Sequence, residues 1–295
     1  MSLFKNYLSL IKFAHTIFAL PFALIGFFLG IGSLQSESGG ADIDFEFYAF
    51  SLLLVLLCMI FARSAAMAFN RYLDRHFDAR NPRTVIREIP AGILSANQVL
   101  WFTIIMSVLF MLSAWMINTI CFILSPVALI VILGYSYTKR FTALCHIVLG
   151  LALSIAPIGA FIAMTGYFSI EPVILSVAVL FWVAGFDIIY ALQDVSFDKE
   201  HGLKSMPVKL GAKNALLLSR FFHLLTAALL IMVGLLIGGG VYYTLGVVVF
   251  IALLIYQHTL VKPDDLGKVN MAFFTTNGVA SVLFGIFAVV DLLSR

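Results

Sequence analysis

Long apolar runs alternate with short polar connections along nearly the whole chain of 295 residues. A helix that spans a bilayer needs about 20 mostly apolar residues, so a window of that length locates the candidate spans. It predicts nine of them, at 14 to 33, 47 to 70, 97 to 117, 119 to 136, 146 to 168, 172 to 193, 215 to 237, 241 to 261 and 271 to 293. The pattern therefore predicts an all-α membrane protein whose residues 1–295 form a single transmembrane domain.

Composition agrees with this fold class, because 62% of the residues are hydrophobic and only 11% are charged. The net charge of +3 is small and the basic residues lie in short clusters, so no nucleic-acid partner is indicated, and no protein partner either. The three cysteines are far apart without C-x-x-C pairing, which favours neither a zinc site nor a disulfide framework. The N-terminus shows no Arg-rich or Ser-rich presequence, which favours a multi-pass protein of a prokaryotic cytoplasmic (inner) membrane.

The orientation in the lipid bilayer follows from the positions of lysine and arginine. These residues gather before the first span and in alternate connections, whereas the intervening connections carry mostly acidic residues such as Glu46 and Glu171. The basic side is expected to be cytoplasmic. With nine spans, this places the N-terminus inside and the C-terminus outside.

Two of the cytoplasmic connections, near 71–96 and 199–214, are longer than the others and are entered through similar sequences. The first motif is Asn70-x-x-x-Asp74-x-x-x-Asp78, and the second is Tyr190-x-x-x-Asp194-x-x-x-Asp198, so that the second motif and its loop cover 194–214. Long loops commonly carry function, and membrane folds often place an internal repeat around a site. The pair of motifs therefore predicts two halves of one site.

Each motif places two carboxylates four residues apart, on one face of a helix. Such pairs repel by about 0.2–0.5 kcal/mol, and a helix C-terminus disfavours an anion by a further ~0.3–1 kcal/mol. A solvated helix end, with Asp74 paired to Arg71 or Arg75, would explain one motif, but two equivalent copies favour a bound cation. The ligands offered are all oxygen atoms, including the Asn70 carbonyl, and this set suits Mg²⁺.

The long connections also carry basic residues that a metal site alone would not need. Arg83, Arg87 and Lys204 are placed to contact phosphate oxygens. The alternative for any one of them is the positive-inside bias of cytoplasmic loops.

Two ionisable residues, Arg63 and Asp187, lie seven residues before Asn70 and Asp194, inside apolar runs. An arginine there costs at least ~2.5 kcal/mol to insert, so a role in the site is expected, with a buried Arg63–Asp187 pair as the structural alternative. His15, His223 and His258 are scattered on apolar faces and are interpreted as core or interfacial residues.

The chain resembles the UbiA-type membrane aromatic prenyltransferases over nearly its whole length. The resemblance rests on I-K-F-A-H-T-I-F-A-L-P-F-A-L at 11–24, R-S-A-A-M-A-F-N-R-Y-L-D-R-H-F-D at 63–78, R-E-I-P-A-G at 87–92, Y-T-K-R-F-T at 137–142, and D-I-I-Y-A-L-Q-D-V-S-F-D with G-L-K-S-M-P within 187–207. Among the branches of the family, the chain is most similar to the one that prenylates 4-hydroxybenzoate.

The resemblance implies nine helices around a central cavity capped by the two cytoplasmic loops, and Mg²⁺-dependent transfer of a polyprenyl group from a polyprenyl diphosphate to a ring carbon of a small aromatic acceptor. It implies that five motif residues, Asn70, Asp74, Asp78, Asp194 and Asp198, hold metal-bound diphosphate, and that Asp187 is a functional carboxylate near metal or acceptor. Tyr190 stands where a second Asn would match Asn70, so the half-sites need not contribute equal ligands. For a carboxylate on the acceptor the candidates are Arg63 and Arg140, followed by Lys139 and Tyr137.

Other acceptors keep the same fold and chemistry. A dihydroxynaphthoate of menaquinone biosynthesis is the strongest rival to 4-hydroxybenzoate of ubiquinone biosynthesis, followed by a haem, a chlorophyll precursor or a glycerol ether. A secondary transporter or channel that uses Asp187 and Arg63 as a pathway is the alternative from another class. It predicts ionisable residues near the bilayer midplane, whereas here the carboxylates gather at one interface.

Overall fold

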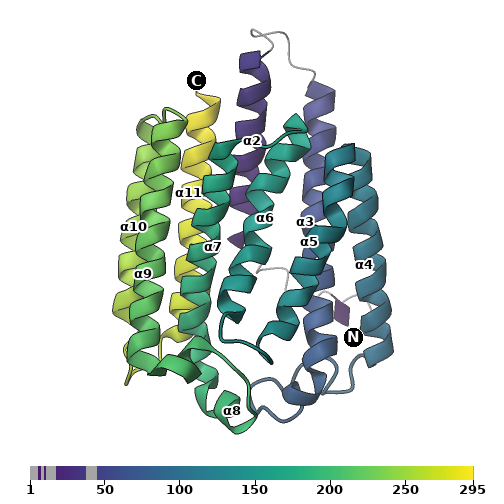
Figure 1. Ribbon diagram of the computed structural model, residues 1–295, viewed down its shortest axis with the longest axis vertical. Coiled ribbons are helices and arrows are strands. Elements are labelled where there is room, and N and C mark those ends of the chain that lie inside the picture. Colours follow the sequence, from purple (N-terminus) through teal and green to yellow (C-terminus); the bar gives the residue numbers. More distant parts are fainter. Residues whose placement is uncertain (1–5, 8–9, 11–17, 38–44, 295) are drawn as a thin grey trace.

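The computed structural model describes residues 6–7, 10, 18–37 and 45–294, and this part of the chain is almost entirely helical (Figure 1). The elements are α2 (Leu20–Glu37), α3 (Phe45–Asp78), α4 (Ala96–Ile117), α5 (Thr119–Thr138), α6 (Cys145–Thr165), α7 (Ile170–Ala191), η2 (Leu192–Asp194), α8 (Val195–Glu200), α9 (Met206–Leu236), α10 (Val241–Leu260), η3 (Met271–Thr276) and α11 (Asn277–Leu293). Within the described residues, nine spans are long and apolar enough to cross a membrane, counting α7 to α8 and η3 to α11 as one each. The predicted number of spans is confirmed over this part; residues 14–17 of the first, with His15, lie outside it.

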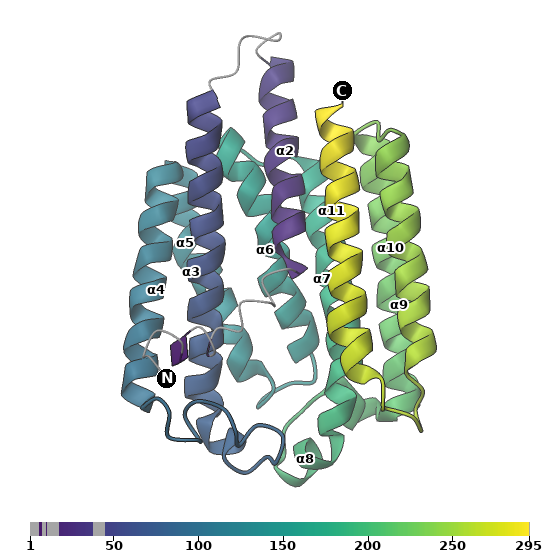
Figure 2. The same ribbon diagram turned by 180° about the vertical axis from the view of Figure 1, so that it is seen from behind.

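The spans run antiparallel, so alternate connections gather at one end of the bundle (Figures 1 and 2). The end drawn at the bottom carries the connection after α3, the α5–α6 turn, α8 and the connection after α10. Tyr7 stacks on Phe102 of α4 with ring centroids 4.8 Å apart, whereas α11 ends at the opposite face. The N-terminal and C-terminal described residues therefore lie towards opposite ends.

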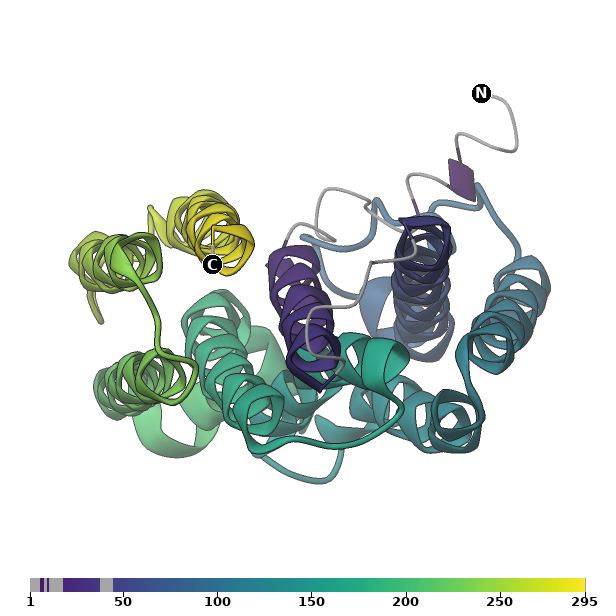
Figure 3. The ribbon, with the colours of Figure 1, turned by 90° about the horizontal axis from the view of Figure 1, so that it is seen from above.

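The core of the bundle is built around α7, which has neighbours on several sides (Figure 3). Its Trp182 is fully buried, with ring centroids 5.1 Å from Phe22 of α2 and 5.6 Å from Phe250 of α10. By contrast, Trp101 and Leu235 are 64% and 79% exposed on outward faces. Lipid supplies no hydrophobic drive for helix association, so van der Waals packing of such side chains holds the spans together.

A close contact between α6 and α7 fixes the register that the site depends on. A Cβ added to Gly150 of α6 would lie 2.3 Å from the carbonyl oxygen of Leu180 on α7. Small residues let transmembrane helices approach this closely. His146 lies four residues before Gly150 on α6, and Asp187 lies seven residues after Leu180 on α7. The close approach of the two helices therefore brings His146 beside Asp187.

The short connection between the third and fourth spans is confirmed. Asn118 is the single residue between α4 and α5; its side-chain oxygen accepts from the Cys121 amide at 2.8 Å, and its side-chain nitrogen donates to the Ile162 carbonyl at 2.9 Å. One side chain therefore caps α5 and ties the turn to α6, because the first amides of a helix lack partners within it.

The helix of the second span continues past the apolar run, which ends at 70, to Asp78, so the predicted position of Asp74 and Asp78 on a helix is confirmed. One predicted connection was wrong. The predicted long connection over 199–214 is short, since α9 already begins at Met206. Ser205 caps α9 by accepting from the Val208 amide, and polar residues around the bend at Gly211 hide this first part from a hydropathy reading.

Candidate active site

A cavity of about 300 Å³ lies at the loop end of the bundle, where the two motifs meet. It confirms that the two motif segments face one space. All the predicted site residues line it except Tyr137 and Lys204: Arg63, Asn70, Asp74, Asp78, Arg83, Arg87, Lys139, Arg140, Asp187, Tyr190, Asp194 and Asp198.

Each motif aspartate is paired with its own basic side chain. The N···O distances are 3.1 Å for Arg140–Asp74, 2.6 Å for Arg87–Asp78, 2.6 Å for Arg83–Asp194 and 2.8 Å for Lys139–Asp198. Four carboxylates gathered in one partly buried cavity would repel one another strongly without such partners. The four pairs keep the cavity close to neutral while leaving both signs of charge available to a ligand.

Arg83 links the two half-sites. It lies in the connection after α3, and its Nε and Nη2 donate to the two oxygens of Asp194 at 3.1 and 2.6 Å, while Nη1 donates to the Tyr190 hydroxyl at 3.0 Å. Burial lowers the pKa of the Arg83 guanidinium, but attraction to the Asp194 carboxylate and the hydrogen bonds to Asp194 and Tyr190 outweigh that effect and raise it. Arg83 is therefore a cation bound to the second motif. It contacts Tyr190, the residue that stands in this motif where Asn70 stands in the first.

The α5–α6 turn supplies the other two basic partners. Lys139 reaches Asp198 of the second motif, and Arg140 reaches Asp74 of the first while also donating to the Leu73 carbonyl at 2.9 Å. Burial lowers the pKa of Lys139, but attraction to Asp198 outweighs it and the pKa is raised. Two adjacent residues of one turn thus contact both motifs.

Lys204 and Tyr137, the two predicted site residues that do not line the cavity, have other partners. The Lys204 ammonium donates to the Phe141 carbonyl at 3.1 Å, and the Lys204 amide donates to the Lys139 carbonyl at 2.7 Å. Lys204 therefore braces the α5–α6 turn from outside the cavity and does not point at a phosphate position. Tyr137 is 42% exposed and its ring lies against Phe69, with centroids 5.9 Å apart.

The second motif does not form the regular helix face that its spacing predicts. Whereas α3 runs unbroken through Asn70, Asp74 and Asp78, α7 ends at Ala191, and a 3₁₀ turn over Leu192–Asp194 leads into α8. A 3₁₀ turn is tighter than an α-helical one, so side chains four apart across it no longer stack. Asp194 and Asp198 both still reach the cavity.

One carboxylate oxygen of the motifs, Oδ2 of Asp78, is buried without a hydrogen-bond partner among the described residues. Unsatisfied buried oxygens of this kind are ligands for a hard cation. Among the described residues, no three carboxylate, histidine or cysteine side chains converge closely enough to hold an ion by themselves. The donor set therefore fits an ion that arrives with further oxygen ligands of its own, as Mg²⁺ does when it bridges to phosphate.

Asn70 joins the first half-site through its amide. Its nitrogen donates to Oδ2 of Asp74 at 3.0 Å and lies 3.5 Å from the Ser136 hydroxyl. This orientation leaves the Asn70 carbonyl oxygen as a potential ligand.

Arg63 lies deeper, between this cavity and a second one. The predicted alternative, a pair between Arg63 and Asp187, is wrong, because Asp187 is paired with His146 at 2.7 Å. The Nε of Arg63 is buried without a hydrogen-bond partner in the described chain. A buried donor without a partner is costly inside a membrane protein, and an anionic ligand would satisfy it.

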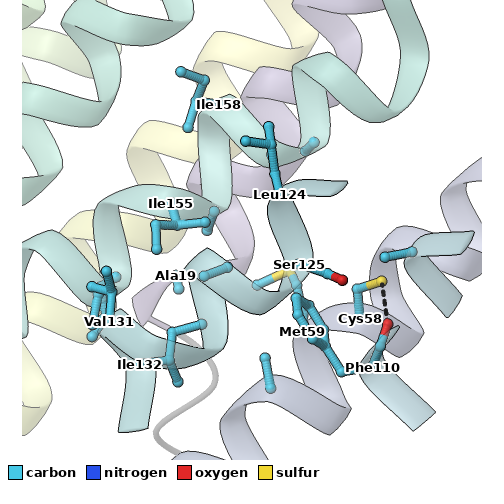
Figure 4. A pocket seen from close by; sticks show the side chains of 18 of the residues that line it. Ala19, Cys58, Met59, Phe110, Leu124, Ser125, Val131, Ile132, Ile155 and Ile158 are labelled. Atoms are coloured by element: carbon cyan, nitrogen blue, oxygen red, sulfur yellow. Dashed lines mark hydrogen bonds between the residues drawn. The ribbon is translucent and has the colours of Figure 1, made fainter. Parts of the chain in front are cut away.

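The second cavity, about 420 Å³, is apolar and begins where the charged one ends. Arg63, Met67, Tyr135, Leu149 and Leu153 line both. Figure 4 shows its wall of apolar side chains, including Met59, Phe110, Ile132 and Ile155. Val127 and Phe168, 56% and 57% exposed, place part of its lining at the outer surface.

His146 lines the cavity and bonds to Asp187, but the sequence did not identify it as a site residue. It lies in the first turn of α6 with only 3% of its side chain exposed. A single histidine in an apolar run gives no signal, and only the antiparallel approach of α7 identifies its partner. His223 and His258 bond to each other at 2.9 Å, and His223 also contacts the Trp182 carbonyl, away from the cavity, so their interpretation as core residues is confirmed.

Comparison with known proteins places the chain in a family. The UbiA prenyltransferase family matches residues 15–279. A 4-hydroxybenzoate octaprenyltransferase of Tolumonas auensis is 32% identical over 80% of this chain and 82% of its own length, and one of Nitrosomonas eutropha is 31% identical over 79% and 81%. The chain belongs to the UbiA prenyltransferase family and is a membrane-embedded prenyltransferase.

Solved structures agree on the fold. An apo UbiA homolog from Aeropyrum pernix K1 superposes with a TM-score of 0.82 at 31% identity, over 94% of this chain and 98% of that one. A UbiA homolog from Archaeoglobus fulgidus bound to DMAPP and Mg²⁺ gives a TM-score of 0.75 at 23% identity, over 98% and 100%. The second likeness concerns the fold alone.

Proposed function

We propose that this protein transfers a polyprenyl group from a polyprenyl diphosphate to a ring carbon of 4-hydroxybenzoate, with Mg²⁺ as cofactor. The observation that carries the proposal is a charged cavity next to an apolar one. The charged cavity holds four pairs of a motif aspartate and a basic residue, and it shares part of its lining with the apolar cavity. A diphosphate suits the first, and an isoprenoid chain suits the second.

The motif residues Asn70, Asp74, Asp78, Asp194 and Asp198 would hold Mg²⁺ together with the diphosphate. When bound, the ion neutralises charge on the diphosphate and makes it a better leaving group. Arg83, Arg87, Lys139 and Arg140, which pair with the aspartates here, would turn to the oxygens of the diphosphate, since forked guanidinium groups match phosphate. Basic groups held beside the diphosphate would stabilise its growing charge with little reorganisation of solvent.

In the reaction the C–O bond to the diphosphate breaks, and its electron pair leaves with the diphosphate. A ring carbon beside the phenolic hydroxyl supplies the pair for the new C–C bond and gives up its proton. Asp187 is the proton acceptor we propose, because Oδ2 is held by His146 and Oδ1 makes no bond within the described residues. The apolar cavity keeps water from the allylic cation.

Arg63 would bind the carboxylate of the acceptor. Arg63 and Arg140 each keep a buried Nε without a partner, but Nη2 of Arg140 donates to Asp74 and to the Leu73 carbonyl, whereas the Arg63 side chain makes no hydrogen bond or ion pair within the described residues. Both 4-hydroxybenzoate and a dihydroxynaphthoate carry a carboxylate, so this contact selects the class of acceptor and the shape of the pocket selects the ring.

We place the protein in the cytoplasmic membrane with the cavity end facing the cytoplasm, the N-terminus inside and the C-terminus outside. The basic connections gather at the cavity end, as the positive-inside rule requires of a cytoplasmic face. Cysteines introduced one at a time at the exposed positions Arg80, in the connection after α3, and Val241, at the start of α10, into a variant without Cys58, Cys121 and Cys145 test this orientation. An impermeant maleimide added to intact cells should label only the second, and labelling of only the first would reverse it.

The proposal is tested with membranes that contain the protein, Mg²⁺, a labelled polyprenyl diphosphate and separate acceptors, with the products identified by mass. Prenylated 4-hydroxybenzoate, lost with EDTA and restored by Mg²⁺, is the expected result. Product formed only with 1,4-dihydroxy-2-naphthoate would show that this compound, and not 4-hydroxybenzoate, is the acceptor. Transfer that persists in EDTA would show that the reaction does not need the metal.

A further inference from the structure

His146 connects three helices beside the charged cavity. It lies on α6; its Nδ1 is 2.7 Å from Oδ2 of Asp187 on α7, and its Nε2 accepts from the amide of Met206, the first residue of α9, at 3.2 Å. No motif contains His146. The family resemblance and the pattern of carboxylates leave it unassigned.

The second of these contacts determines where the imidazole carries its proton. A backbone amide can only donate, so Nε2 must offer its lone pair to Met206. A proton on Nε2 would point at the Met206 N–H and leave that amide without an acceptor. The Met206 amide has no acceptor within α9, because the first amides of a helix are free. The contact therefore favours neutral imidazole with its proton on Nδ1.

The first contact follows from this tautomer. With the proton on Nδ1, the imidazole donates to Oδ2 of Asp187 and holds the carboxylate in one orientation. The other oxygen, Oδ1, makes no hydrogen bond with the part of the chain that the structure describes, and Asp187 lines the cavity. A histidine held by a carboxylate on one nitrogen and a backbone group on the other is a common way to fix a working side chain.

We propose that His146 is a positioning residue: through its Nδ1–H it holds Asp187 with one oxygen bonded and the other turned to the acceptor. The Met206 amide fixes the tautomer, and so the start of α9 sets the orientation of Asp187. This inference rests on the proposed function for the role of Asp187, but the tautomer itself does not.

The tautomer is measured on protein labelled with ¹⁵N-histidine in detergent, with the His146→Asn variant used to assign the signal. The expected spectrum shows a protonated Nδ1 and an unprotonated Nε2 in the wild-type protein. In the Asp187→Ala variant the tautomer should stay the same, because the Met206 amide still binds Nε2, but the Nδ1 signal should shift because its hydrogen bond is lost. A proton on Nε2, or an Nδ1 signal that Asp187→Ala leaves unshifted, would overturn the proposal without any assay of transfer.

Three variants separate positioning from capping. The nitrogen of Asn overlays Nδ1 and keeps the donor to Asp187, the oxygen of Gln overlays Nε2 and keeps only the cap on Met206, and Ala keeps neither. His146→Gln and His146→Ala are expected to lower kcat about 10–100-fold with an unchanged KM for the diphosphate. His146→Asn should recover most of this loss. Thermal melting of all three variants reports on folding.

Rescue by Gln but not by Asn would show that His146 only caps α9, and equal activity of all three variants with the wild type would remove any role. If the wild-type protein transfers no prenyl group to any acceptor, the proposed function fails. The ¹⁵N measurement then still decides between the tautomers.

Discussion

The two motif-bearing segments share their spacing of carboxylates, but they do not contribute alike. The first runs through unbroken helix into a long connection that sends Arg87 to its own half-site and Arg83 across to Asp194. The second passes through a 3₁₀ turn, and its short connection sends no basic side chain into the cavity, because Lys204 turns to the Phe141 carbonyl. Two motifs with the same spacing of carboxylates can therefore form half-sites that differ in the number of basic residues they supply.

The second segment is completed by groups from elsewhere. Arg83 arrives from the first connection and Lys139 from the α5–α6 turn. Both basic partners of the second half-site thus come from outside its own segment, and Arg83 comes from the first, whereas the first half-site takes only Arg140 from outside.

The largest effect is expected from removing one carboxylate of either half. Asp74→Ala and Asp194→Ala should each lower prenyl transfer by at least ~100-fold, because neither half holds metal and diphosphate alone. Product formation per mole of folded protein is the measurement. Unchanged helical circular dichroism and elution volume provide the control, and undiminished transfer in either variant would remove that half from the metal site.

The next largest effect is expected at Arg83, which joins the two segments through its ion pair with Asp194. Arg83→Ala should lower kcat/KM for the diphosphate about 10–100-fold, and Arg83→Lys should recover only part, since an ammonium lacks the fork that holds both oxygens of Asp194. Steady-state kinetics with varied diphosphate measure this. If the lysine variant equals the wild type, Arg83 acts as a simple charge.

A smaller effect is expected at Tyr190, which stands where the first segment has Asn70. Tyr190→Phe removes the bond from Arg83 Nη1 to the hydroxyl, worth about 1 kcal/mol or ~5-fold in transfer. The same change in the Arg83→Ala background should have almost no effect, because the partner is already gone. Full additivity of the two changes would contradict the link between them.

The smallest effect is expected at Lys204. Lys204→Met should change kcat/KM for the diphosphate by less than about twofold, because the ammonium braces a turn at the surface and surface substitutions have small effects. A loss as large as that of Arg83→Ala would place Lys204 on the diphosphate after all.

Much of this arrangement could be predicted from the sequence, because hydropathy locates spans and a period of four locates a helix face. The cavity gathers Arg63, Asn70 and the motif aspartates as their spacing predicts. The tight turn at Leu192–Asp194 and the early start of α9 could not be predicted, since local polarity masks both. His146 could not either, because its importance arises only from the approach of α6 to α7.

The central claim is that the two segments form one diphosphate site. Calorimetry with geranyl thiolodiphosphate, which resists ionisation, measures this directly in wild type, Asp74→Ala and Asp194→Ala with Mg²⁺ present. The account predicts one analogue bound per chain in the wild type and loss of that binding in both variants. Two analogues per chain, or undiminished binding in either variant, would contradict it.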